Sequence, residues 1–176
     1  MFLTVIAMAA AVAAPAPSSP DRILTSHGLG QVEVGMSVKQ AEQVLHIRLK
    51  IDDSQEPGGE CVYAYETAGP GAQVGYMVIK GKIQRIDIQL KGDASIKTQG
   101  GLGLGATQAG VRGAYGRGAR HDQTDPNDDG PPDENSGLIV KDPNGKSGIR
   151  VGFQKGALAW LIAGNYPALS FYEGCL

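Results

Sequence analysis

The glycines of GGLGLGATQAGVRGAYG, residues 100–116, are the first residues whose types and spacing suggest chemistry. A G-x-G-x-x-A pattern starting at Gly101 matches the loop that cradles a dinucleotide pyrophosphate at the start of a helix. Such a loop follows a strand directly inside a parallel βαβ unit. Here the preceding strand candidate ends near Leu90, and KGDASIKTQG intervenes. We therefore expect no nucleotide cofactor and interpret Gly105 as a backbone bend ahead of a helix.

An acidic stretch, DQTDPNDDGPPDENSG at residues 122–137, is the second candidate for chemistry. Its alternating oxygen-bearing side chains and central glycine are typical of the first half of a calcium loop. The ligands would be Asp125, Asn127, Asp129 and Asp133. The twelfth position is Ser136, where such loops carry a bidentate glutamate. Two interpretations stay open, a calcium-binding loop and a solvated acidic loop, and no other cofactor is predicted.

The chain has two cysteines, Cys61 and Cys175, and their role depends on the compartment. In an oxidising environment an even pair predicts a disulfide. Such a bridge would close a loop of over a hundred residues and stabilise the fold by about 4–5 kcal/mol in the chain-entropy model. The alternative is a reactive thiol, which needs a neighbouring base or cation that neither GGECVYAY nor YEGCL supplies. We predict the disulfide.

The start of the chain predicts export. Residues 1–13 are apolar but fall short of the roughly twenty residues that a transmembrane helix needs, and Ala11-Val12-Ala13 fits a processing site. We interpret 1–13 as a signal peptide and the Pro/Ser-rich residues 14–26 as a linker. The absence of Lys and Arg before the apolar run leaves an uncleaved anchor as the alternative. The protein is thus expected to be periplasmic or secreted. Its net charge of −2 argues against a nucleic-acid partner.

These residues must be positioned by elements that recur along the chain. VEVGMSVKQAEQVLH, residues 32–46, aligns with LGLGATQAGVRGAYG, residues 102–116, at a constant offset of 70. Ser37 and Thr107 occupy equivalent N-cap positions ahead of apolar residues spaced for one helix face. Both segments therefore predict a short helix.

A hairpin pattern follows each predicted helix. YMVIKGKIQRIDIQL, residues 76–90, aligns with VGFQKGALAWLIAG, residues 151–164, and each has Lys-Gly between two strand-like runs. Further strands are expected at 61–66 and 137–141. We predict an α+β fold of two tandem repeats, each a short helix packed on an antiparallel sheet of about three strands. Repeat 1 would span 27–95, and repeat 2 would span 96–176 with the acidic loop 122–137.

Four segments of the chain resemble small secreted proteobacterial proteins of uncharacterised function. The segments are GQVEVGMSVKQAEQVL, YMVIKGKIQRIDI, TQGGLGLGATQAGVRGAYG and GNYPALSFYEGC. The tandem helix-plus-sheet architecture resembles that of the beta-lactamase inhibitory protein and of the SmpA/OmlA type of outer-membrane assembly lipoproteins. Those relatives act through protein contacts, and the resemblance implies the same for this chain. The chain departs from the lipoproteins because no lipid-anchor cysteine follows the apolar run.

The function predicted from the sequence is a non-enzymatic secreted or periplasmic protein-binding module, such as an inhibitor or an envelope-assembly protein. Its partner would be an envelope or secreted protein. Trp160 is the predicted interface residue, because it aligns with Arg85, which we expect to be exposed, and because tryptophan is a favoured interface anchor. Burial of Trp160 in the core is the competing interpretation. A calcium-binding loop protein and a hydrolase with an unrecognised site are the alternative functions.

Overall fold

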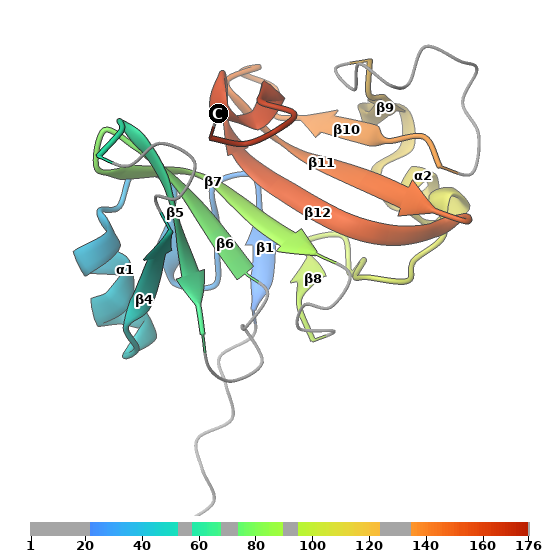
Figure 1. Cartoon of the computed structure of the whole chain (residues 1–176). Coiled ribbons are helices and arrows are strands. Elements are labelled where there is room, and N and C mark those ends of the chain that lie inside the picture. The colour runs from blue at the N-terminus through green and yellow to red at the C-terminus, as the bar shows by residue number, and fades with distance from the viewer. Residues whose placement is uncertain (1–21, 53–57, 68–73, 90–94, 124–134, 176) are drawn as a thin grey trace, which may run out of the picture.

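The computed structural model describes residues 22–52, 58–67, 74–89, 95–123 and 135–175. Their strands form one eight-stranded antiparallel sheet and one small four-stranded sheet (Figure 1). The order across the large sheet is β4 (Leu49–Asp52), β5 (Cys61–Glu66), β6 (Val74–Ile79), β7 (Lys82–Gln89), β12 (Ala157–Asn165), β11 (Ser147–Gln154), β10 (Leu138–Lys141) and β9 (Ala119–His121). The order in the small sheet is β3 (Val32–Glu33), β2 (Gly28–Leu29), β1 (Ile23–Thr25) and β8 (Lys97–Thr98).

Helices α1 (Val38–Leu45) and α2 (Gln108–Tyr115) begin as the sequence predicts. The Ser37 hydroxyl accepts the Gln40 amide at 3.3 Å, and the Gln40 side chain accepts the Ser37 amide at 2.9 Å. The Thr107 hydroxyl accepts the Gly110 amide at 3.1 Å. Two 3-10 turns complete the helical elements of the described residues, η2 (Gly116–Gly118) and η3 (Ala168–Ser170). None of these helices is long and apolar enough to cross a membrane.

The two predicted hairpin turns are confirmed. Lys80-Gly81 joins β6 to β7, and Lys155-Gly156 joins β11 to β12, with positive φ angles at all four residues. The segments before the two helices also bond to equivalent strand residues. Gly35 donates its amide to the Ile83 carbonyl as Gly105 does to the Leu158 carbonyl, at 2.7 and 2.8 Å.

The predicted fold of two tandem repeats, each a short helix on an antiparallel sheet of about three strands, is wrong. Strand β7 pairs with β12, so that Asp87 opposes Ile162 and Ile88 opposes Leu161, and both predicted hairpins belong to one continuous sheet. The chain is mostly sheet, with a second small sheet that the sequence did not indicate. Periodicity reports which face of a strand is buried but not which strand lies beside it. Strands of two or three residues leave no periodicity at all, and Ile23–Thr25, at the end of the expected linker, is strand β1.

One face of the large sheet carries the main hydrophobic core. Both helices and the small sheet pack on this face through buried residues such as Ala41, Val111 and Leu24. The sheet contributes fully buried side chains, among them Tyr76, Ile86, Ile88, Leu138 and Leu161. The opposite face carries no helix of the described chain except η3, so its side chains are free to form a site.

Candidate functional site

The helix-free face of the large sheet is hollowed into an open groove with a volume of about 1210 Å³. Its floor comes from side chains that alternate with the core residues along β5, β7, β11 and β12. The polar residues on the floor and rim are Lys50, Asp52, Glu66, Thr67, Arg85, Asp87, Gln89, Asn135, Arg150, Gln154 and Glu173. The large apolar and aromatic residues are Tyr63, Tyr65, Ile88, Phe153, Trp160, Ile162 and Tyr172. The groove therefore combines aromatic side chains with pairs of opposite charges.

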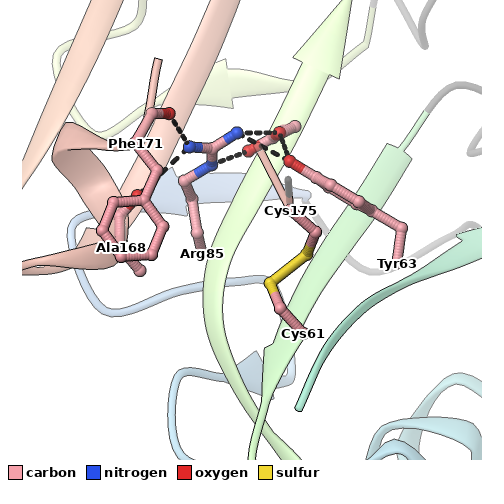
Figure 2. The surroundings of a disulfide bond; sticks show 7 residues. Cys61, Tyr63, Arg85, Ala168, Phe171 and Cys175 are labelled. Carbon is pink, nitrogen blue, oxygen red and sulfur yellow. Dashed lines mark hydrogen bonds and ion pairs between the residues drawn. A yellow bond between two sulfur atoms is a disulfide. The ribbon is translucent and has the colours of Figure 1, made fainter. Parts of the chain in front are cut away.

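The C-terminal segment bounds one end of the groove and is fixed there by a disulfide. Cys175 bonds to Cys61 on β5, which confirms the predicted bridge (Figure 2). Between β12 and this bridge the chain passes through η3, whose Leu169 is fully buried. The disulfide ties the last described residue of the chain to the first half of the sheet.

Arg85 on β7 also holds this segment, through hydrogen bonds to its backbone (Figure 2). Its guanidinium donates to the carbonyl oxygens of Ala168, at 3.1 Å, and Phe171. It also forms a two-pronged ion pair with Asp87 at 2.7 and 2.8 Å and donates to the Tyr63 hydroxyl at 2.6 Å. The sequence placed Arg85 on the exposed face of its strand. It does lie on the helix-free face, but it is only 2% exposed because the C-terminal segment covers it.

The charges around Arg85 shift the pKa values of the groups that share them. Burial opposes the arginine's charge, but the hydrogen bonds and charge of Asp87 raise the pKa of Arg85 above its ordinary value. Burial and the Asp87 carboxylate raise the pKa of Tyr63 well above that of a free tyrosine. Tyr63 therefore stays protonated at physiological pH, where its hydroxyl donates to Asp87 at 2.7 Å.

Arg150 on β11 is a second buried arginine, from the other half of the sheet. Its Nε donates to Asp122 at 2.5 Å, and its Nη1 donates to the Leu169 carbonyl at 3.0 Å. Both partners of the ion pair are 1% exposed. Arg85 and Arg150, from the two halves of the sheet, thus bind carbonyl groups of the same short segment, those of Ala168, Leu169 and Phe171. A buried arginine needs such partners, because an unpaired charge out of water is strongly unfavourable.

Two sets of aromatic rings lie across glycines on the groove floor. Trp160 covers Gly152 of the neighbouring strand β11, where a Cβ atom would stand 1.9 Å from the indole Cε2 and 2.1–2.3 Å from its bonded neighbours. Tyr65 covers Gly75 of β6, where a Cβ atom would stand 2.8 Å from Cε1. The rings of Tyr63 and Tyr65 are nearly parallel, with centroids 5.5 Å apart. Larger residues at either glycine would lift these rings off the sheet.

Trp160, the predicted interface residue, lies in the groove and is half-buried. The Arg150 guanidinium lies 5.8 Å from the centroid of its ring, within cation–π range. Its role in binding stays a prediction. The predicted calcium ligands Asp125, Asn127, Asp129 and Asp133 lie outside the described residues. Among the residues that are described, no three His, Cys, Asp or Glu side chains are grouped so that they could hold a metal ion.

The glycine stretch serves the packing of α2 and the small sheet. Gly105 has a φ of +85° and makes the predicted bend two residues before the Thr107 cap. Gly103 is closed in by β8 and the residue before it, since a Cβ atom there would stand 2.7 Å from Lys97 Nζ and 2.9 Å from the Ile96 carbonyl oxygen. The strand before the stretch is the two-residue β8, which pairs with β1 in the small sheet. A dinucleotide loop instead connects a strand and a helix inside a parallel βαβ unit.

The sequence did not reveal that Arg85 and Arg150 bind the carbonyl groups of the C-terminal segment and so clamp it onto the sheet. The alternation in KIQRIDIQ places Arg85 and Asp87 on one face, but solvent exposure was the simpler interpretation of that pattern. Nothing in residues 165–175 predicts that they return over the sheet, except Cys175. The alternation of Tyr63 and Tyr65 in CVYAYE was the available signal for the aromatic floor.

No protein-family model matches the chain, and no curated protein sequence is significantly similar to it. A similarity exists at the level of fold to the crystal structure of the uncharacterized protein yfeY from Escherichia coli. The two share a TM-score of 0.51 and 11% sequence identity over 81% of this chain and 99% of that one. At this identity the similarity concerns the fold alone, so the function must be argued from the groove.

Proposed function

We propose that this protein is a non-enzymatic binding module of the cell envelope or the secreted fraction, and that its groove binds a partner protein. The observation that carries the proposal is the aromatic floor. Trp160 and Tyr65 are half-buried in a concave surface at the centre of the sheet. Tryptophan and tyrosine in such positions contribute most to protein interfaces, because they bury large areas with little loss of side-chain freedom.

The aromatic surface continues from the floor onto the rim of the groove. Tyr172, which lines the groove, is 42% exposed, and its neighbour Phe171, outside the groove lining, is 38% exposed. Large hydrophobic side chains with that exposure are few among the described residues, and the other two are Ile23 and Ile51. A cluster of half-exposed aromatic residues around one concavity is typical of an interaction site.

The buried aspartates Asp87 and Asp122, which pair with the two buried arginines, support a structural role over a catalytic one. A hydrolase needs a base or nucleophile that is available to a substrate. Asp87 is engaged by Arg85 and Tyr63, and Asp122 by Arg150. The raised pKa of Tyr63 keeps that group from acting as a base. These groups hold the C-terminal segment in place and shape the groove.

An exported location agrees with the Cys61–Cys175 disulfide, because disulfides persist in oxidising compartments. The apolar residues 1–13 would supply the export signal. We accordingly place the partner among proteins of the envelope or the secreted fraction.

Site-specific photocrosslinking in the native envelope tests the proposal. A photoreactive phenylalanine analogue would replace Ile162, which is half-buried on the groove floor, two residues after Trp160 and opposite Arg150 of β11. The matched control places it at Ile51, which is 45% exposed on the edge strand β4 and lies outside the groove.

We expect a defined protein adduct from the Ile162 position and none from Ile51. The captured protein, once purified, should bind the unmodified chain, and Trp160→Ala should weaken that binding by about tenfold or more. Adducts from both positions alike, or purified binding that Trp160→Ala leaves unchanged, would contradict the proposal.

A further inference from the structure

The C-terminal segment has two separate attachments to the sheet, and they hold different parts of it. Arg85 and Arg150 bind backbone carbonyl groups within residues 168–171. The disulfide holds residues 172–175, because it bonds Cys175 to β5. Opening the disulfide would therefore free residues 172–175 and leave the bonds of the two arginines in place.

The disulfide lies outside the main hydrophobic core. Cys175 is 5% exposed and packs in a small cluster with Met77 and Ala168, and half-buried Cys61 packs against this cluster. The main core is a separate cluster whose last member along the chain is Ala163. The residues that the disulfide holds are therefore not needed to exclude water from the main core, and the sheet should stay folded when the bond is open.

Residues 172–175 form the end wall of the groove above Tyr63. Every residue of this range contributes to the lining of the groove. Gly174 packs directly on the Tyr63 ring, since a Cβ atom at Gly174 would stand 3.0 Å from the Tyr63 hydroxyl oxygen. The Tyr63 ring stacks in turn with that of Tyr65 on the floor. Removal of the wall would therefore uncover Tyr63 and take Tyr172 off the rim.

The disulfide can be reached through the groove, because Cys61 and Cys175 both contribute to its lining. Cys61 is the more exposed of the two. One thiolate of a dithiol reductant attacks the Cys61 sulfur to form a mixed disulfide, and Cys175 leaves as a thiolate. The second thiolate of the reductant then displaces Cys61. The reductant ends as a disulfide, the protein gains two electrons, and its two thiolates take up protons from the solvent.

We propose that the Cys61–Cys175 disulfide is a redox-controlled tether of the end wall of the groove. A dithiol opens the bond, residues 172–175 leave Tyr63, and the arginine-bound part of the segment stays on the sheet. On the premise of the proposed function, the oxidised form is the one that binds the partner protein. Reduction takes Tyr172 off the rim and so weakens that binding.

Reduction by dithiothreitol without denaturant tests the tether on the intact protein. The thiols are then blocked with iodoacetamide, and hydrogen exchange is followed by mass spectrometry. Peptides that cover residues 172–175 should exchange about tenfold faster or more after reduction, while β7 and β12 keep their protection. The reduced protein should still unfold cooperatively in urea, at a lower midpoint because the loop is no longer closed.

The titration of Tyr63 gives a second readout of the wall. Burial raises the pKa of the Tyr63 hydroxyl in the oxidised protein, so this pKa should fall towards that of a free tyrosine after reduction. Ultraviolet absorbance measures the titration, and Tyr63→Phe identifies its signal. The matched control is the double variant Cys61→Ser/Cys175→Ser, which should titrate like the reduced protein with and without dithiothreitol.

Three results would overturn the inference. A bond that dithiothreitol does not reduce in the folded protein would show that it cannot be reached through the groove. Loss of cooperative unfolding after reduction would make the disulfide a requirement of the whole fold. Unchanged exchange of residues 172–175, with an unchanged Tyr63 titration, would show that the two arginines alone hold the wall.

The partner that is captured at Ile162 should bind the reduced protein about fivefold more weakly or less, and Tyr172→Ala should weaken binding by the oxidised protein to the same extent. Equal binding by the two redox forms would overturn the redox control.

The failure of this inference can be told from the failure of the proposed function. If the Ile162 position captures nothing beyond the Ile51 control, but reduction still releases residues 172–175, the proposed function is wrong and the tether stands. If a partner is captured but reduction leaves residues 172–175 in place, the tether alone is wrong.

Discussion

The two faces of the eight-stranded sheet are built from alternate residues of the same strands, but one is a buried core and the other is an accessible groove. On the helix-covered face, Ile88 and Leu161 are fully buried among other aliphatic side chains. On the helix-free face, their neighbours Asp87 and Ile162 line an open groove. The first face holds the fold together by excluding water. The second uses charge pairs, a disulfide and aromatic rings to hold a concave surface that remains accessible.

The buried ion pair on the helix-free face should give the largest effect. Arg150→Met leaves Asp122 buried without its arginine and removes a bond to the Leu169 carbonyl, so we expect a loss of about 3–5 kcal/mol in the free energy of unfolding. Urea denaturation measures it. The double variant Arg150→Met/Asp122→Asn should recover part of the loss, because no uncompensated charge then remains. A double variant as unstable as the single one would show that the charge pair is not what Arg150 contributes.

A pair of adjacent substitutions compares the faces directly. Leu161→Ala removes a fully buried side chain from the core and should lower the free energy of unfolding by about 2–5 kcal/mol. Ile162→Ala, one residue later and half-buried on the groove floor, should lower it by about 1 kcal/mol or less. Equal losses in urea denaturation would mean that the groove floor is a second core.

Two glycines on opposite sides of the molecule should respond to alanine with opposite signs. Gly152→Ala places a Cβ atom 1.9 Å from the Trp160 ring, so the indole must move, with an expected loss of about 1–3 kcal/mol. Trp160 fluorescence should shift to the red as the ring becomes more exposed. Gly113→Ala lies in helix α2 with no atom near the added Cβ and should stabilise the protein by about 0.5–1 kcal/mol. A stable Gly152→Ala with unchanged emission would contradict the placement of the indole.

Alkaline pH should lower the free energy of unfolding through one buried tyrosine on each face, Tyr63 in the groove and Tyr76 in the core. In the folded state, burial raises the pKa of the Tyr63 and Tyr76 hydroxyls, and the neighbouring carboxylates, Asp87 and Glu66 respectively, raise it further. As the pH rises above about 10, these two hydroxyls therefore lose their protons in the unfolded chain before they do so in the folded protein. The free energy of unfolding is therefore highest below that pH. Above it, each of the two tyrosines lowers the free energy of unfolding by about 1.4 kcal/mol for every pH unit. Tyr63→Phe and Tyr76→Phe should each reduce this slope by one such step in urea denaturation between pH 9 and pH 11. Unchanged slopes would contradict the burial of the two hydroxyls.

The predictable part of the fold was local. Ser37 and Thr107 cap their helices, and Lys80 and Lys155 make their turns, because cap and turn chemistry depends on a few neighbouring residues. The Cys61–Cys175 bridge followed from the number of cysteines and the expected compartment.

The unpredictable part was long-range. Nothing in the alternation of β7 and β12 shows that they are neighbours, and their pairing joins the two hairpins in one sheet. The groove depends on that pairing and on the return of residues 166–175 over Arg85 and Arg150. Arg85 therefore appeared exposed from its strand pattern, although a distant segment covers it. Trp160 was singled out by the same alignment, and its companions Tyr65 and Ile162 were missed.

The comparison of photocrosslinking at Ile162 and at Ile51 tests the central claim most directly, because the two positions report on the groove and on a surface outside it. The account predicts a protein adduct in the native envelope from Ile162 alone, lost when Trp160→Ala is introduced in the same chain. Adduct formation that is equal at the two positions, or that survives Trp160→Ala, would show that the helix-free face is not the binding surface.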